Sequence, residues 1–286
     1  MNQNNYSMQW SSKNPGLQIY LLDQSHSMGE KYPEHGTKAM FAAVAINRCI
    51  REVIEANSDG SNVKDRAKII IIGYGGKGGD SVEVMREGML SQYADNPIRL
   101  VKAKRMVAGM DRGMTEIVED TPVYIEGVAR GSTAMGSAFH LAYEEIQKFL
   151  AEHPQSPAPI LINVTDGCPW SYEREHKEEE YAIKEAQRIM SIETPDGTPL
   201  LFNAHIGTGS QPYTCPAYGT VLRGRGPQFL SKISPIIPDA YKAVASKLGI
   251  RLEENALGFV SDASPAIFNM FIAFGSSGAM RDRMSA

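Results

Sequence analysis

Residues 17–27 read LQIYLLDQSHS, a short apolar run that leads directly into a turn rich in side-chain oxygens. Pro15 and Gly16 precede the run, and polar residues follow it. An apolar run bounded by turn residues in this way is typical of a buried central strand. The turn carries oxygen-bearing side chains at alternate positions, so a tight loop can direct them to one point; these are Asp23, Ser25 and Ser27.

Strand-like runs alternate with helical patterns along the rest of the chain. Helical periodicity over 37–56 precedes the run from Ala67 to Tyr74, whose four consecutive isoleucines favour a strand. Strand, helix and strand in this order imply a parallel pair with a right-handed crossover. The same reasoning predicts strands over 159–165, 200–206 and 257–260, and helices over 136–151, 172–192, 228–248 (interrupted by Pro235 and Pro238) and 265–274 (capped by Ser264).

This alternation predicts an α/β fold with three layers, in which helices flank a central and mostly parallel sheet. We expect a flexible N-terminal arm over residues 1–16 and a single domain over 17–286, with insertions around 75–130 and 208–226. The first insertion is expected to hold irregular strands near 82–90 and 121–128. The glycine-rich stretch at 73–80 lacks the spacing of a phosphate-binding loop, so we interpret it as a flexible loop. The charged run within 172–192 is interpreted as a solvated helix face.

The composition excludes several classes of function. A net charge of -4 gives no electrostatic reason to bind nucleic acid or an anionic membrane. The three cysteines form no CxxC pair, so neither a disulfide framework nor a structural zinc site is indicated. The first residues carry no secretory signal, and no apolar stretch is long enough to span a membrane. We therefore expect a cytoplasmic protein that binds neither nucleic acid nor membrane.

Oxygen donors gather where the predicted strands end. In an open α/β sheet, ligands bind beyond the carboxyl ends of the strands. Asp166 directly follows a predicted strand, and Thr133 lies just before a predicted helix. With the turn after residue 22, they form a set of two carboxylates and three hydroxyls, hard donors that favour Mg²⁺, Mn²⁺ or Ca²⁺. Such a set leaves the cation under-neutralised, and a carboxylate from another molecule is a natural further ligand.

This combination resembles the metal-ion-dependent adhesion site (MIDAS) of the von Willebrand factor A family, which joins a DxSxS motif to a distant Thr and a distant Asp. The resemblance covers residues from about 16 to about 275 and implies a Rossmann-like fold with strand order 3-2-1-4-5-6. It implies that Ser25, Ser27 and Thr133 bind the metal directly or through water, and that Asp23 and Asp166 orient waters or bind directly. It further implies a non-enzymatic domain of adhesion or adaptor type, whose metal coordinates a Glu or Asp of a partner protein.

Two further stretches are similar to the cytosolic bacterial TerY-like branch of this family. They are the opening LQIYLLDQSHSM and the ending GFVSDASPAIFNMFIAFGS. This resemblance implies a PP2C-type phosphatase or a protein kinase as the partner. The chain departs from the family in two respects: His26 stands where many members have glycine, and the two insertions exceed what a minimal domain needs.

Other interpretations stay open at this stage. A bound metal could serve a hydrolase acting on phosphoesters, although the matched loops supply neither a general base nor a second metal. The metal could also be purely structural in a scaffold protein. Asp23 and Ser25 could simply cap a helix, which would explain one loop but not Thr133 and Asp166. His26 could respond to pH, or be an ordinary exposed loop histidine.

Overall fold

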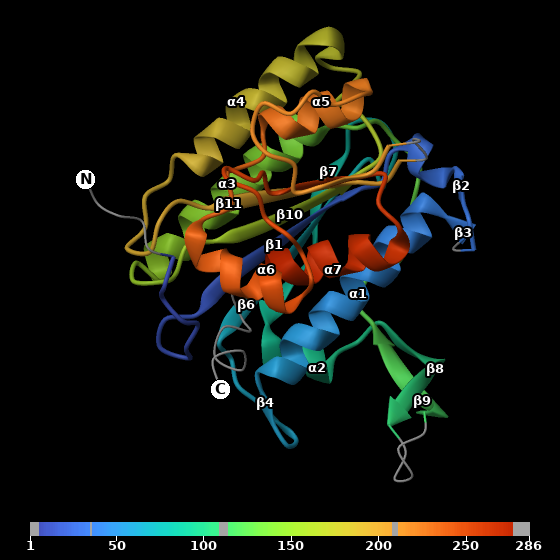
Figure 1. The fold of residues 1–286 in the computed structure, drawn as a ribbon, viewed down its shortest axis with the longest axis vertical. Coiled ribbons are helices and arrows are strands. Elements are labelled where there is room, and N and C mark those ends of the chain that lie inside the picture. The colour runs from blue at the N-terminus through green and yellow to red at the C-terminus, as the bar shows by residue number, and fades with distance from the viewer. Residues whose placement is uncertain (1–5, 35, 109–113, 208–210, 277–286) are drawn as a thin grey trace.

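The fold is a three-layer α/β arrangement around one seven-stranded sheet, seen here in a computed structural model that describes residues 6–34, 36–108, 114–207 and 211–276 (Figure 1). Across the sheet the strands follow the order β12-β13-β11-β10-β1-β6-β7. Helices cover both faces. The fold class predicted from the sequence is therefore confirmed.

The sheet is mostly parallel. Its strands are β1 (Gly16–Asp23), β6 (Ala67–Tyr74), β7 (Val82–Met89), β10 (Ile160–Thr165), β11 (Leu200–His205), β12 (Tyr213–Thr214) and β13 (Phe259–Ser261). Only the pairings of β7 with β6 and of β12 with β13 are antiparallel. With the two-residue strand β12 set aside, the remaining six run 3-2-1-4-5-6 in chain order, as the sequence resemblance implies.

Two apolar cores separate the sheet from its helices. One face is covered by α1 (Lys38–Ala56), α2 (Leu90–Asp95), α6 (Lys242–Lys247) and α7 (Pro265–Gly275), and the other by α3 (Met135–Glu152), α4 (Glu178–Met190) and α5 (Arg225–Lys232). Strand β1 serves both cores, with Tyr20 on one side and Ile19 and Leu21 on the other. Burial on both faces explains why its sequence is mostly apolar rather than alternating, with Gln18 as a buried polar exception.

Short elements complete the described chain. They are the strands β2 (Lys31–Tyr32), β3 (Gly36–Thr37), β4 (Ser58–Asp59) and β5 (Asn62–Val63), the hairpin strands β8 (Arg99–Ala108) and β9 (Met114–Val123), and the 3-10 turns η1 (His26–Gly29), η2 (Glu175–Lys177) and η3 (Asp239–Tyr241). Within the described residues, no helix combines the length and the apolar character needed to cross a membrane.

The helix caps test whether the loop after β1 caps a helix or serves another role. The Thr37 hydroxyl caps α1 by accepting from the amide of Met40, and Ser264 caps α7 as predicted. Ser25 only precedes the short turn η1, and its side chain makes no capping hydrogen bond there. The Ser25 side chain therefore does not cap this turn, contrary to the capping interpretation of that residue.

The insertion at 75–130 differs from its prediction. Strand β7 matches the predicted 82–90, but α2 was not predicted, and the strand expected at 121–128 lies earlier, as the second arm of the hairpin β8–β9. This ribbon projects from the body (Figure 1) and pairs with no strand of the main sheet, so its sequence carries no continuous apolar run. Beyond it, the amides of Tyr124 and Ile125 donate to the side chain of Asn47 instead of extending a strand.

Two further predictions need correction. Residues 6–15 of the predicted flexible arm pack on the body, where Trp10 is buried against Gly16 and the amide of Tyr6 donates to the carbonyl of Asp196; residues 1–5 lie outside the described part. The helix expected from 172 begins only at Glu178. Its charged run is not wholly solvated, because Glu178 and Glu185 are buried and hydrogen-bonded to neighbouring elements.

Candidate functional site

Asp23 lies at the carboxyl end of β1, next to the carboxyl end of β10. Its side chain is fully buried. Oδ1 accepts a hydrogen bond from the amide of Ser25 at 2.8 Å, and Oδ2 accepts one from the hydroxyl of Thr165 at 2.5 Å. Thr165 is the last residue of β10, so the parallel pairing of β10 with β1 brings it to this carboxylate.

A line of side-chain hydrogen bonds continues from this turn to the next strand. The hydroxyls of Ser25 and Ser27 lie 3.1 Å apart, and Ser27 donates to Oδ1 of Asp166 at 2.7 Å. Asp166 follows β10 directly. Four of the five residues predicted as metal ligands therefore meet at one edge of the sheet: Asp23, Ser25, Ser27 and Asp166.

Thr133 reaches the same edge through the backbone. Ser25 pairs with Gly131 in a parallel bridge, and the amide of His26 donates to the carbonyl of Gly131 at 2.8 Å. Thr133, two residues further on, is buried and pairs with Trp170 in an antiparallel bridge. Its hydroxyl is not part of the hydrogen-bonded line that the described residues form, so its role as a ligand stays a prediction.

Glycines permit this close approach of loops. A Cβ on Gly131 would lie 2.5 Å from the carbonyl oxygens of both Gly75 and Gly79. Gly75 itself has a φ of +90°, which L side chains rarely adopt. The stretch 73–80, interpreted from the sequence as a flexible loop, thus forms a packing surface for the loop that carries Thr133.

Asp80 is a positioning residue that sequence reasoning missed. It accepts hydrogen bonds from the hydroxyl of Ser132 at 2.5 Å and from the amides of Tyr172 and Glu173, each at 2.8 Å. It therefore ties the loop before α3 to the loop after β10. Two of its partners are backbone groups, which leave no signature in a sequence.

Lys38, the first residue of α1, is the second missed residue. Its ammonium donates to Oδ2 of Asp166 at 2.7 Å and to Glu30 at 2.6 Å. Burial lowers the pKa of Lys38, but its hydrogen bonds to the two carboxylates outweigh burial and raise that pKa above its usual value. The ammonium is charged, and it is the nearest cation to the predicted ligands in the described structure.

Two carboxylates of the site, those of Asp23 and Asp166, lie close enough for one to affect the charge of the other. Burial, together with the nearby Asp166 carboxylate, raises the pKa of Asp23 to about 7, against the hydrogen bonds from Ser25 and Thr165. Two carboxylates with hydroxyls between them suit a hard divalent cation, which would relieve their repulsion. The donor set thus fits such an ion. Among the described residues, no group of three or more His, Cys, Asp or Glu side chains has the geometry of a metal site, and the candidate site itself supplies two such residues, Asp23 and Asp166, beside its hydroxyls.

A cavity of about 410 Å³ opens beside Asp166. Arg223 and Arg225 line it together with Lys38, and Asp262 contributes a carboxylate. Burial lowers the pKa of His205 in its wall, and this imidazole is hydrogen-bonded to Ser261 at 2.9 Å. The cavity therefore has a mixed charge: Lys38 is paired with Asp166, and Arg225 is paired with Glu179.

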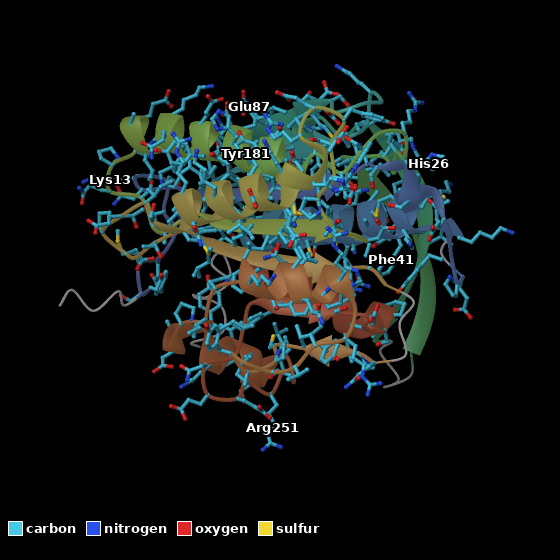
Figure 2. All side chains as sticks on the ribbon, turned by 90° about the horizontal axis from the view of Figure 1, so that it is seen from above. Lys13, His26, Phe41, Glu87, Tyr181 and Arg251 are labelled. Atoms are coloured by element: carbon cyan, nitrogen blue, oxygen red, sulfur yellow. The ribbon has the colours of Figure 1, made fainter. Side chains whose placement is uncertain are left out.

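His26 has an exposed side chain, while its backbone joins the site (Figure 2). The simpler interpretation of this residue, an exposed loop histidine, agrees with that exposure. In the same view Glu87, from the edge strand β7, and Arg251, which follows α6, lie at opposite sides of the molecule.

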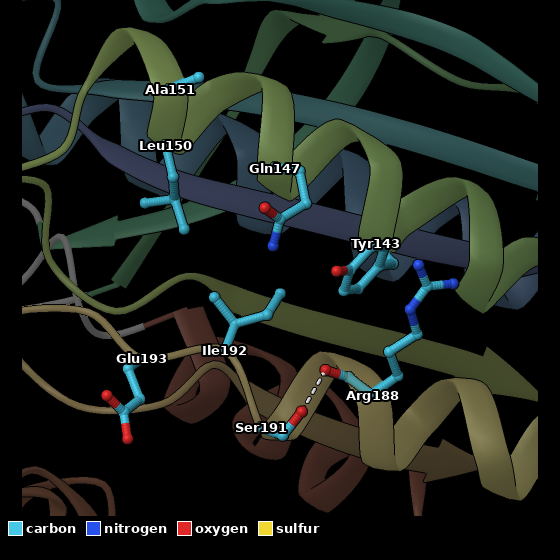
Figure 3. Close-up of a pocket in the computed structure, with 8 residues that line it drawn as sticks. All are labelled: Tyr143, Gln147, Leu150, Ala151, Arg188, Ser191, Ile192 and Glu193. Carbon is cyan, nitrogen blue, oxygen red and sulfur yellow. Dashed lines mark hydrogen bonds between the residues drawn. The ribbon is translucent and has the colours of Figure 1, made fainter.

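A second cavity, of about 460 Å³, lies between α3 and α4 (Figure 3). The guanidinium of Arg188 sits 3.7 Å above the ring of Tyr143, and the Ser191 hydroxyl donates to the carbonyl of Arg188. The lining comes from α3, from Arg188 near the end of α4 and from residues 191–193 after that helix, in the segment that leads to the amino end of β11. None of the predicted ligands lines this cavity.

Comparisons with known proteins give distant structural similarity only. No family model matches the chain, and no curated protein matches it. Among solved structures, the three N-terminal domains of the type V pili tip protein Mfa5 from Porphyromonas gingivalis align with 55% of this chain and 20% of theirs, at 12% identity and a TM-score of 0.32. The vWF domain of the same protein aligns over 55% of this chain and 39% of its own, at 12% identity and a TM-score of 0.31.

The PilB minor pilin from Streptococcus sanguinis aligns with 95% of this chain and 62% of its own length, at 10% identity and a TM-score of 0.47. The chain thus spans less than two thirds of each of these three proteins. The fold assignment rests on the strand order and layers of the chain itself.

Proposed function

We propose that this chain is a divalent-cation-dependent protein-binding domain of the von Willebrand factor A type, of adhesion or adaptor character and without catalytic activity. The ion, Mg²⁺ or in its place Mn²⁺ or Ca²⁺, would be held by Asp23, Ser25, Ser27, Thr133 and Asp166. A Glu or Asp carboxylate of the partner protein would complete its coordination. The observation that carries the proposal is the hydrogen-bonded line from Asp23 to Asp166 across two adjacent strand ends.

The chemistry of the donors supports binding rather than turnover. Hydroxyl oxygens are neutral ligands, and Asp166 is already paired with Lys38, so a bound ion would keep much of its positive charge. Such an ion attracts a carboxylate strongly. The neighbouring cavity, with Arg223 and Arg225 in its wall, extends the cationic surface that an acidic side chain would meet.

Exposed aromatic side chains beside the site offer contact area for a partner. Trp170 and Tyr172 are 42% and 67% exposed, and their rings meet edge to face with centroids 4.7 Å apart. Trp170 pairs through its backbone with Thr133. Aromatic anchors next to a charged centre are typical of binding hot spots.

The TerY-like resemblance suggests which partners to test first. A PP2C-type phosphatase and a protein kinase are the candidates, and the cytoplasm is the proposed setting. The proposed contact requires a Glu or Asp at the surface of the partner.

The test begins with the metal alone. Isothermal titration of the purified chain with MgCl₂ and MnCl₂ should show one site, and Ser25→Ala should abolish it while the circular dichroism spectrum stays unchanged. Candidate partners should then be captured in Mg²⁺ but not in EDTA, and a Glu-containing peptide from the partner should compete.

Three results would contradict the proposal. Absence of metal binding would remove its basis. Capture that persists in EDTA would show that the metal is structural, as in a scaffold protein. Mg²⁺-dependent hydrolysis of phosphoesters that disappears in Asp166→Asn would indicate a hydrolase instead.

A further inference from the structure

We propose that Lys38 is a tethered competitor for the cation: its ammonium neutralises Asp166, holds one carboxylate oxygen, and so keeps the affinity for metal low until an acidic partner is present. This inference rests on the proposed metal site and concerns how that site is regulated. It involves a residue outside the predicted ligand set.

Hydrogen bonds hold both the backbone amide and the side-chain ammonium of Lys38. Its backbone amide donates to the carbonyl of Glu30 at 3.1 Å, and its ammonium donates to the carboxylate of the same Glu30 at 2.6 Å. Thr37 caps the helix that begins at Lys38. The side chain is only 9% exposed, and that of Asp166 is 1% exposed, so solvent screens their contact weakly.

Both oxygens of Asp166 are engaged by donors. Ser27 donates to Oδ1 and Lys38 to Oδ2, each at 2.7 Å. An ion in direct contact with Asp166 would share its oxygens with these two donors, whereas an ion that keeps its water can contact the carboxylate indirectly. A divalent ion placed among these ligands is also repelled by the ammonium. Lys38 thus opposes metal binding in two ways: its ammonium occupies one acceptor position on Asp166, and its positive charge repels the ion.

A partner carboxylate changes this balance. It brings a negative charge to an ion that Lys38 otherwise repels, so metal and partner should each strengthen the binding of the other. The domain would load its metal chiefly in the complex. This coupling follows from the shared ion itself; the effect specific to Lys38 is that its removal should strengthen metal binding in the absence of a partner.

The decisive variant is Lys38→Met, which keeps most of the length of the stem and removes the charge. Titration calorimetry with MgCl₂, and electron paramagnetic resonance with MnCl₂, should give a Kd about 10- to 100-fold lower than that of the wild type, because the repulsion of the ion is gone. Lys38→Arg retains the charge and should stay near the wild type. Lys242→Met removes the same charge from an exposed pair with Asp239 and should have no effect.

A stability measurement separates competition from a structural role. Lys38→Met leaves the buried Asp166 without its cation, so the variant should unfold at a lower temperature in EDTA. Saturating Mg²⁺ should raise its unfolding temperature more than that of the wild type, since tighter binding stabilises the folded state more. A purely structural lysine would lower stability equally in both buffers.

The unaltered protein provides a second test, which holds even if the variant fails to fold. The ¹⁵N resonance of the Lys38 ammonium should shift as Mg²⁺ is added, and an unchanged resonance at saturation would overturn the inference. Equal or weaker metal affinity in Lys38→Met would also overturn it, while leaving the proposed function intact. Absence of metal binding in both proteins would overturn the proposed function and this inference together.

Discussion

The hydroxyl of Ser27 donates to Oδ1 of Asp166 at 2.7 Å and so joins two side chains that stand 139 positions apart in the sequence. This contact links the loop after β1 to the loop after β10 by protein groups alone. Because the Asp166 side chain is 1% exposed, its two oxygens depend on the protein for hydrogen bonds, and Ser27 and Lys38 supply them.

Ser27→Ala should therefore affect both stability and metal binding. Loss of one donor to a buried carboxylate should lower the free energy of unfolding by about 1–3 kcal/mol, measured by urea denaturation in EDTA. The same change removes a proposed ligand, so calorimetry should show that Mg²⁺ binding weakens at least about tenfold.

Ser61→Ala is the matched control, because Ser61 is exposed in the turn between β4 and β5. Its stability and its metal affinity should equal those of the wild type. If Ser27→Ala also behaves as the wild type, the hydroxyl contributes neither to folding nor to a metal site.

Gly131→Ala should disturb the loop that carries Thr133. The added methyl group would lie 2.5 Å from two backbone carbonyl oxygens, which cannot rotate away as a side chain would. Overpacking of this kind costs about 1–3 kcal/mol, and thermal unfolding should reveal it. Gly167→Ala is the control, since no atom lies within 4 Å of the place its methyl group would take and its φ is not positive. Equal unfolding temperatures for the two variants would argue against close packing of these loops.

Glu178 should impose a pH dependence on stability. Burial raises its pKa, against hydrogen bonds from the amide of Gly136 and the hydroxyl of Ser171 and against the charge of Arg174. The folded protein therefore retains this proton to a higher pH than the unfolded chain does. Its contribution to stability is full below the unfolded pKa and is lost as pH rises through the folded pKa.

Glu178→Gln removes this titration. Urea denaturation at a series of pH values should show that the free energy of unfolding of the variant falls less than that of the wild type as pH rises above about 4.3, the ordinary pKa of glutamate. Glu180→Gln, at an exposed position of the same helix, should follow the wild-type profile. A Glu178→Gln profile parallel to the wild type would mean that the pKa of Glu178 is not raised.

Much of the fold follows from strands that are buried on both faces. Such strands are mostly apolar, with isolated buried polar residues such as Gln18, so Leu17–Leu22 and the isoleucines of β6 are enough to predict a central parallel sheet from the sequence. Strand β8 was not predicted and β9 was predicted too late in the sequence, for the opposite reason. The hairpin that they form belongs to no buried sheet, and its sequence therefore lacks the pattern from which strands are recognised.

The candidate site was predictable where it follows from sheet geometry. Asp23 and Asp166 each stand at or next to the carboxyl end of a strand, and adjacent parallel strands must bring them together. Lys38 and Asp80 were not predictable, because their partners come from distant loops or from the backbone. A lysine at the start of a helix and an aspartate after glycines are ordinary in sequence, and only the tertiary structure gives them a role.

Trp170 and Tyr172 provide the last prediction, which concerns the partner rather than the metal. Both rings are largely exposed beside the Thr133 loop, and an aromatic side chain that acts as a binding hot spot contributes about 2 kcal/mol or more when it is buried in an interface. Replacing both residues with alanine should weaken partner binding by about 10-fold or more in surface plasmon resonance, while Mg²⁺ affinity measured by calorimetry stays unchanged.

Tyr218→Ala is the control for this double variant, because Tyr218 is also highly exposed. It lies in the loop before α5, where the neighbouring Ala217 forms a β-bridge with Ala256 and not with the Thr133 loop. This control should bind the partner as the wild type does. If Tyr218→Ala weakens the complex and the double variant does not, the partner approaches from the side of β12 and β13. The aromatic pair would then serve only to pack the loop after β10, and the metal would be reached across the cavity that Arg223 and Arg225 line.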